Sequence, residues 1–175
     1  MNQRVYIDET KARNYLMVAA AVVPEDDRAV RGAVRSLILP GQRRLHMHDE
    51  RDSRRRQILS TLTSVGVTAT IYDAGGAERP QLTRRAACLA AIATDAHLAG
   101  HDHLVLEQDE TLLRFDREQL IECLRAIGNA TLTYEHRPSG QEILLGIPDA
   151  IAWAWARGGD WRRRARPLVT DVRHV

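Results

Sequence analysis

The chain has 175 residues, of which 44% are hydrophobic and 27% are charged, and its formal net charge is +2. This length suits one domain with a sizeable core, and the charge excludes a strongly basic protein. We expect a cytoplasmic protein, because we see no basic segment leading into an apolar run at the N-terminus and no apolar stretch that could span a bilayer. Cys88 and Cys123 lie in apolar helical patterns without metal-type spacing, so free thiols are expected and redox chemistry is not indicated.

Positive charge in this chain is almost entirely arginine, since Lys11 is the only lysine. The arginines gather at residues 54–56 and 162–164. Such groups can neutralise phosphates, and they can equally be solvated helix faces. Composition leaves both interpretations open.

The first two predicted strands cover residues 4–9 and 15–23, and the short link between them favours an antiparallel hairpin. The second strand lacks polar alternation, so both of its faces should be covered. The first ends in Asp8 and Glu9, two adjacent acids that are costly to desolvate at the mouth of a core. Either a cation offsets this cost, or the two acids begin a turn.

The remainder of the chain alternates between strands and helices after a predicted helical insertion at residues 25–64. Three strand–helix units predict one α/β domain over residues 1–175, with helices packed on a mixed five-stranded sheet. Asp116 and Gln119 are expected to form a capping box. The arginine-rich tail, residues 160–175, suggests a short helix and then a strand. The predicted units pair strands 67–72, 104–107 and 131–135 with helices 82–99, 116–128 and 148–157.

Acidic residues recur where strands end and where helices begin. Asp8 and Glu9 end the first strand, Glu107 and Asp109 end or follow the fourth, and Asp149 opens the last clear helix. Each has a structural explanation as a strand end, a turn or a helix N-terminus. If the first and fourth strands are neighbours, the acids converge on the edge where open α/β sheets bind ligands. There they could hold Mg²⁺ or Mn²⁺ and activate water for phosphodiester cleavage.

Two further pairs of residues have open roles. His46 and His48 would face the same way on an extended segment, as a metal ligand or general base, or as a solvent-facing pair. Trp153 and Trp155 lie two apart on the last helix and point to nearly opposite sides. The safer interpretation places them in the core or at a subunit interface, and base stacking is the alternative.

Four segments of this chain resemble the domain-of-unknown-function 3800 family of bacterial proteins. They are VYIDET, LHMHDE followed by RRRQIL, LVLEQDE, and LLGIPDAIAWAWARGGDW. Members of that family typically begin with an aromatic-hydrophobic-Asp-Glu-Ser/Thr strand and close with a hydrophobic helix bearing a single Asp. Here Thr10-Lys11 replaces the commoner Ser/Thr-Gly.

The resemblance implies a ribonuclease H-like fold, and it gives no established substrate. Together with the converging acids, it leads us to expect a metal-dependent nuclease that acts on RNA or DNA. It assigns Asp8, Glu107 and Asp149 as the metal-binding and catalytic acids. Asp109 is expected as a further metal ligand, with Glu9 as an auxiliary acid and His46 as a base or ligand. The tail arginines would hold the nucleic-acid backbone.

Two other functions compete with this hypothesis. The first is a module on the same scaffold that binds nucleic acid or protein without chemistry. It predicts acids too far apart for one metal, or acids occupied by arginines such as those at 54–56. The second is a homodimeric assembly protein whose apolar last helix forms the interface, indifferent to mutation of the acids.

Overall fold

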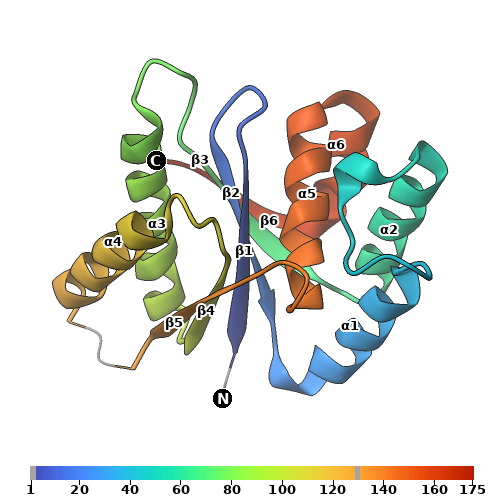
Figure 1. Ribbon diagram of the computed structural model, residues 1–175, viewed down its shortest axis with the longest axis horizontal. Helices are drawn as coiled ribbons and strands as arrows, with labels where there is room; N and C mark the ends of the chain where they lie inside the picture. The colour runs from blue at the N-terminus through green and yellow to red at the C-terminus, as the bar shows by residue number, and fades with distance from the viewer. Residues whose placement is uncertain (1–2, 129–130) are drawn as a thin grey trace.

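The computed structural model describes residues 3–128 and 131–175, which form one mixed sheet with helices on both faces (Figure 1). The strands are β1 (Arg4–Thr10), β2 (Leu16–Val22), β3 (Thr68–Asp73), β4 (His103–Glu107), β5 (Thr133–Arg137) and β6 (Val169–His174). The α-helices are α1 (Pro24–Leu37), α2 (Asp52–Ser64), α3 (Gln81–Leu98), α4 (Leu113–Ala126), α5 (Gly146–Arg157) and α6 (Gly159–Ala165). Short 3₁₀ turns are η1 (Met47–Asp49), η2 (Ile143–Leu145) and η3 (Arg166–Leu168).

The sheet has the strand order β5-β4-β1-β2-β3-β6. As expected, β1 and β2 form an antiparallel hairpin, and β1 also pairs in parallel with β4. The central strand β2 is buried along almost its whole length, which explains its lack of polar alternation. The first and fourth strands are therefore neighbours, as convergence of the acids requires.

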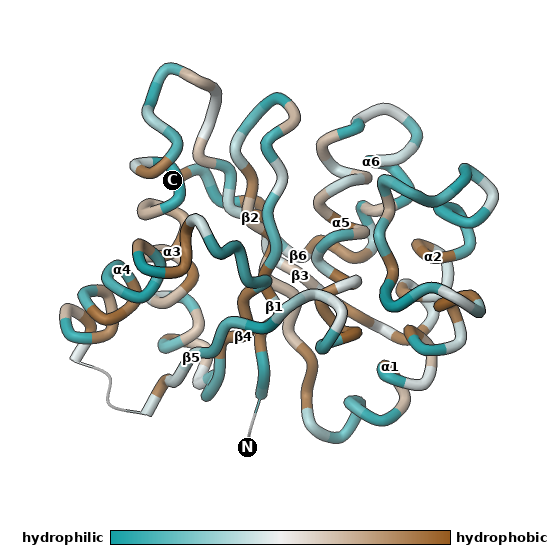
Figure 2. Tube along the Cα trace, in the orientation of Figure 1, coloured by the Kyte–Doolittle hydropathy of each residue, from teal (hydrophilic) through white to brown (hydrophobic). Residues whose placement is uncertain are grey.

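Two helical layers enclose the sheet. Helices α3 and α4 cover one face, and α1, α2, α5 and α6 cover the other (Figure 1). Alternate residues of β1 enter separate cores, because side chains of a strand point to opposite faces: Tyr6 packs with α5, and Ile7 packs with α3. Hydrophilic and hydrophobic residues alternate along α4, the pattern of a helix with one buried side (Figure 2).

The sheet has six strands, so the prediction of five was wrong. The sixth, β6, comes from the tail and pairs in parallel with β3, with a register shift between Ala69 and Thr70. Val169 is buried and Val172 packs against the core, so this part of the arginine-rich tail belongs to the folded domain. Among the helices of the described part of the chain, none is long and apolar enough to cross a membrane.

Helix α4 begins a turn earlier than the sequence pattern indicated. The carboxylate of Asp109 accepts hydrogen bonds from the Thr111 backbone N–H (2.9 Å) and hydroxyl (2.6 Å), and Leu112 N–H donates to the Asp109 carbonyl (3.0 Å). This turn starts the helix at Leu113 and places Asp116 inside it. The expected capping role of Asp116 was therefore wrong.

Candidate functional site

Strands β1 and β4 bring two of the predicted acids together. Their parallel register aligns Ile7 with Leu106, so Asp8 and Glu107 follow side by side at the carboxyl ends of both strands. Helix α5 packs on β1 and carries Asp149 in its first turn. These three residues, called the acid cluster below, come from three segments that are far apart in the sequence. They lie on the α5 side of the sheet.

Asp8 is the member of the acid cluster whose pKa is raised by its surroundings. Burial raises the pKa of Asp8 well above its usual range, and the negative charges of Glu107 and Asp149 raise it further. A side-chain hydrogen bond with Glu107 acts in the same direction, and Arg44 opposes these effects. Asp8 therefore binds a proton more tightly than an ordinary aspartate does.

Glu107 has an arginine partner that sequence reasoning missed. The Arg44 guanidinium donates from Nη1 to Glu107 Oε1 at 2.8 Å, and both side chains are about a quarter exposed, at 28% and 24%. Arg44 lies between α1 and η1, outside the arginine group at 54–56 that we considered as a partner. Sixty-three residues separate the two, so no local pattern signals the pair.

Asp149 is fixed by the segment around η1. Its Oδ2 accepts a hydrogen bond from the Met47 backbone N–H at 2.8 Å, and its Oδ1 lies 3.1 Å from His46 Nδ1. The hydrogen bond to Asp149 raises the pKa of His46, although burial and Arg44 act against it. His46 thus contacts a member of the acid cluster, whereas the His48 side chain is 80% exposed and lies 3.3 Å from Asp49.

Arg55 braces this segment from its other side. Its guanidinium donates to the carbonyl oxygens of Met47 and His48, both at 2.9 Å, and lies 4.3 Å from the ring centroid of Trp153. Trp153 follows Asp149 by one helical turn, so both lie on the same side of α5. Arg55 therefore links α2, η1 and α5 around the acid that η1 holds.

Glu9 points to the opposite face of the sheet from Asp8. Its carboxylate forms a 2.8 Å ion pair with Lys11 and accepts short hydrogen bonds from Arg85 and the Tyr15 hydroxyl. Arg85 lies on α3 and its side chain is only 3% exposed. The neighbouring acid predicted as an auxiliary catalyst is thus held by cations on the α3 side.

A buried ion network continues behind Glu9. Arg85 donates to both carboxylate oxygens of Asp116, at 2.5 and 2.6 Å, and His136 Nε2 lies 3.2 Å from Asp116 Oδ2. Burial alone would raise the pKa of Asp116, but the hydrogen bonds from Arg85 and His136 outweigh it and hold this pKa below its usual range. Asp116 has the sequence pattern of a capping residue, and only the packing of the helices shows that it is an ion-pair partner.

A cavity of about 400 Å³ adjoins the acid cluster on the α3 side. Its floor is apolar and its walls carry Asp8, Glu9, Glu107, Asp109 and Arg85. Asp109, Asp8 and Glu107 therefore all line this cavity. Hydrogen bonds from Thr111 to the Asp109 carboxylate lower the pKa of Asp109.

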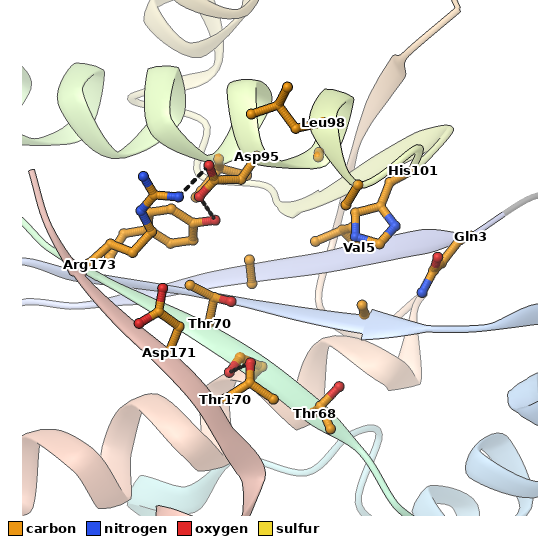
Figure 3. Close-up of a pocket in the computed structure, with 17 residues that line it drawn as sticks. Gln3, Val5, Thr68, Thr70, Asp95, Leu98, His101, Thr170, Asp171 and Arg173 are labelled. Carbon is orange, nitrogen blue, oxygen red and sulfur yellow. Dashed lines mark hydrogen bonds and ion pairs between the residues drawn. The ribbon is translucent and has the colours of Figure 1, made fainter.

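The larger cavity, of about 570 Å³, lies away from the acids, between α3 and strands β2, β3 and β6 (Figure 3). Asp95 projects into it from α3 and accepts hydrogen bonds from the Tyr72 hydroxyl (2.9 Å) and Arg173 (2.6 Å). Thr70 and Asp171 face the same space. This groove contains none of the predicted site residues.

The tail arginines and the two tryptophans of α5 have partners within the domain. Arg163 and Arg164 both pair with Asp160, while Arg162 lies 5.2 Å from the Trp155 ring centroid and donates to the Trp155 carbonyl at 3.0 Å. The Trp153 ring meets the edge of Trp161, with centroids 5.3 Å apart. Both tryptophans pack partly on the core, in line with the safer sequence interpretation. Cys88 and Cys123 are free, as expected.

The donor set of the acid cluster suits a hard divalent cation, because it consists of carboxylates. Burial, together with the negative charges of Glu107 and Asp149, raises the pKa of Asp8. Within residues 3–128 and 131–175, however, no three His, Cys, Asp or Glu side chains stand in a metal-binding arrangement. Glu107 points one carboxylate oxygen at Arg44 instead. The acid cluster thus has the donor type for a hard divalent cation, and Arg44 occupies one of its donor oxygens.

The mixed six-stranded sheet flanked by helices is a ribonuclease H-like α/β fold. The solved structure of the PCNA:RNase HII complex from Archaeoglobus fulgidus contains a similar chain, with a TM-score of 0.61 and 12% sequence identity. The match covers 94% of this chain and 77% of that chain. No protein-family model and no curated protein matches the sequence, so the resemblance to the domain-of-unknown-function 3800 family stays a prediction.

Proposed function

We propose that this protein is a divalent-metal-dependent nuclease that hydrolyses phosphodiester bonds at the acid cluster. The observation that carries the proposal is the meeting of Asp8, Glu107 and Asp149 at the ends of β1, β4 and the start of α5. The nuclease-like fold supports it. A resident Mg²⁺ or Mn²⁺ would activate water and stabilise the leaving oxygen.

Each residue of the acid cluster has a distinct environment for this task. Asp8 is the most deeply crowded carboxylate and gains most from an added positive charge. Asp149 keeps a fixed orientation, because Met47 and His46 bond its two oxygens, as the outer partners of metal ligands usually do. Asp109 is a candidate further ligand from the adjoining cavity wall.

His46 has the contacts that a proton-transfer residue needs. Its Nδ1 faces Asp149, so a carboxylate orients the ring and its Nε2 remains for a water or a leaving oxygen. Glu9 would act from the opposite face, by fixing the end of β1 through Arg85 and Tyr15 rather than by touching substrate.

Cleavage of labelled RNA and DNA oligonucleotides, single- and double-stranded, tests the proposal. Wild type should cut at least one of them with Mg²⁺ or Mn²⁺ and none with EDTA. Asp8→Asn and Asp149→Asn should each lose about a hundredfold or more, because each removes a carboxylate from the metal shell. Asp49→Asn is the matched control, since the Asp49 side chain is 68% exposed and lies outside the acid cluster. Unchanged cleavage by Asp8→Asn would contradict the proposal.

A binding module without chemistry is the second candidate, and the Arg44–Glu107 ion pair favours it. Such a module would bind oligonucleotides equally with EDTA and with Mn²⁺. The same oligonucleotides, followed by fluorescence anisotropy, separate the two functions. Metal-independent binding without any cleavage would support the module.

A further inference from the structure

Arg44 lies among the acids at which a cation is expected. Its guanidinium bonds Glu107 at 2.8 Å, its charge lowers the proton affinity of Asp8, and it also acts on His46, whose ring contacts Asp149. One positive charge thus acts on two of the three acids and on the histidine that contacts the third. This placement reduces the repulsion that crowding creates within the acid cluster.

In this position, Arg44 would compete with a divalent ion for the Glu107 carboxylate. A cation at the acid cluster needs carboxylate oxygens with free lone pairs, and one Glu107 oxygen accepts the Arg44 hydrogen bond. Two positive charges also repel each other at such a short range. A divalent ion that used this Glu107 oxygen would therefore displace the Arg44 guanidinium from it.

Arg44 has room and a chemical partner for such a move. It lies in the connection between α1 and η1, outside regular secondary structure, and its side chain is 28% exposed. Guanidinium presents a planar fork of donors that matches phosphate oxygens. A phosphodiester bound over the acid cluster would bring such oxygens within its reach.

We propose that Arg44 is a resident counter-cation of the acid cluster, which metal and substrate displace together. In the metal-free protein it neutralises Glu107; when a divalent ion binds, its guanidinium transfers to a non-bridging oxygen of the substrate phosphate. This inference rests on the proposed function and names the residue that couples its two ligands. Metal alone then binds weakly, and metal with nucleic acid binds cooperatively.

Mn²⁺ binding, measured by isothermal titration calorimetry without nucleic acid, tests the first half of the proposal. Arg44→Gln should bind Mn²⁺ more tightly than wild type, by about fivefold or more, since it removes the competitor. Arg43→Gln is the matched control, because it removes the same charge from the exposed neighbouring residue. It should bind Mn²⁺ within about twofold of wild type, the scale of a screened surface charge.

Oligonucleotide affinity tests the second half of the proposal. We would follow anisotropy of a labelled oligonucleotide with EDTA and with Ca²⁺, another hard cation with oxygen ligands. Wild type should gain affinity from Ca²⁺, and Arg44→Gln should lose most of that gain. Arg44→Lys keeps the charge without the fork and should retain weak Mn²⁺ binding while losing part of the gain.

The outcomes separate this inference from the proposed function. Equal or weaker Mn²⁺ binding by Arg44→Gln, with tight binding by wild type, overturns the counter-cation and leaves the metal site standing. Absence of Mn²⁺ binding by every variant overturns the metal site itself and the counter-cation with it. If Arg44→Gln does not fold, as judged by its unfolding transition in EDTA, Arg44→Met and Arg44→Lys carry the same comparison.

Discussion

Asp8 and Glu9 are neighbours in the chain, yet their carboxylates point toward opposite faces of the sheet. Asp8 is crowded by Glu107 and Asp149 on the α5 side, whereas Glu9 pairs with Arg85 on the α3 side. The two carboxylates therefore lie in opposite electrostatic environments. Asp8 faces two neighbouring acids whose effect Arg44 only partly opposes, and Glu9 has cations in direct contact.

Replacement of Asp8 should stabilise the metal-free protein. Burial and the nearby acids raise the pKa of Asp8 in the folded state, while the unfolded chain keeps a value of about 3.9. The folded state therefore holds this proton more tightly, so wild-type stability falls as pH rises from about 4 through the raised pKa. Asp8→Asn removes this loss and should be about 0.5–2 kcal/mol more stable at pH 8 in EDTA.

Urea unfolding at pH 4 and pH 8 checks this expectation. The advantage of Asp8→Asn should shrink at pH 4, and Mn²⁺ should stabilise wild type while leaving the variant unchanged. Asp109→Asn is the control, since Thr111 lowers the Asp109 pKa and no gain is expected from its removal. A less stable Asp8→Asn protein at pH 8 would contradict the crowding of charge at this site.

Loss of Arg85 should destabilise the fold severely. Arg85→Met leaves the fully buried carboxylate of Asp116 without its main cation, and such unpaired buried charges cost about 3–5 kcal/mol. The double variant Arg85→Met with Asp116→Asn should recover a large part of that loss, because it removes the stranded charge. Urea denaturation of both single variants and the double variant measures the coupling. A loss below about 1 kcal/mol for Arg85→Met would show that the pair is unimportant.

Acid unfolding should depend on Asp116. Hydrogen bonds from Arg85 and His136 hold its pKa below the usual value despite burial, so its stabilising effect is present above about pH 4 and is lost as pH falls through the depressed folded value. Asp116→Asn should be less stable at neutral pH and show a shallower fall in stability below pH 4. Stability measured between pH 2 and pH 6 gives both slopes. Parallel slopes for the two proteins would rule out this source of acid sensitivity.

The tail arginines should contribute to nucleic-acid affinity through phosphate contacts. Arg163→Gln with Arg164→Gln should reduce the dependence of log affinity on log salt by about 1.4 for a single strand, or 0.7 per phosphate contact. Anisotropy titrations across a range of NaCl concentrations measure the slope. An unchanged slope would mean that Asp160 retains both side chains and that they remain a solvated helix face.

Gly146 should be needed for the geometry of the acid cluster. A Cβ at this position would lie 3.0 Å from Leu45 Cβ, so Gly146→Ala would push the segment of Arg44 and His46 from α5. Overpacking of about 1–3 kcal/mol opposes a gain in helix propensity of up to about 1 kcal/mol. We expect cleavage to fall about tenfold or more with a small change in stability, since a misplacement of about 1 Å can already cost about a hundredfold in rate.

Gly32→Ala is the matched control for that change, because nothing lies within 4 Å of the added Cβ in helix α1. It should gain up to about 1 kcal/mol of stability with unchanged cleavage. Cleavage rates and unfolding midpoints of the two variants, measured side by side, give the comparison. Full activity in Gly146→Ala would show that the contact with Leu45 tolerates the methyl group.

The sequence by itself determined the alternation of strands and helices, the buried second strand, and the three acids at element ends. These are local features, because hydrophobic period and turn residues are set by neighbours along the chain. The acids Asp8, Glu107 and Asp149 could be proposed together because parallel strands end at one edge. The sequence indicated a strand in the tail, but it did not indicate that this strand, β6, pairs with β3.

Tertiary structure alone decided which charges meet. The pairs Arg44–Glu107 and Arg85–Asp116 join residues 63 and 31 positions apart, on segments with no shared pattern. Asp116 has the spacing of a capping residue, and packing against α3 made it a buried ion-pair partner instead. Long-range pairs depend on strand order and helix packing, which many sequences of the same local pattern could satisfy differently. That is why the sequence could propose the three acids together but could not identify the arginines that pair with acidic side chains.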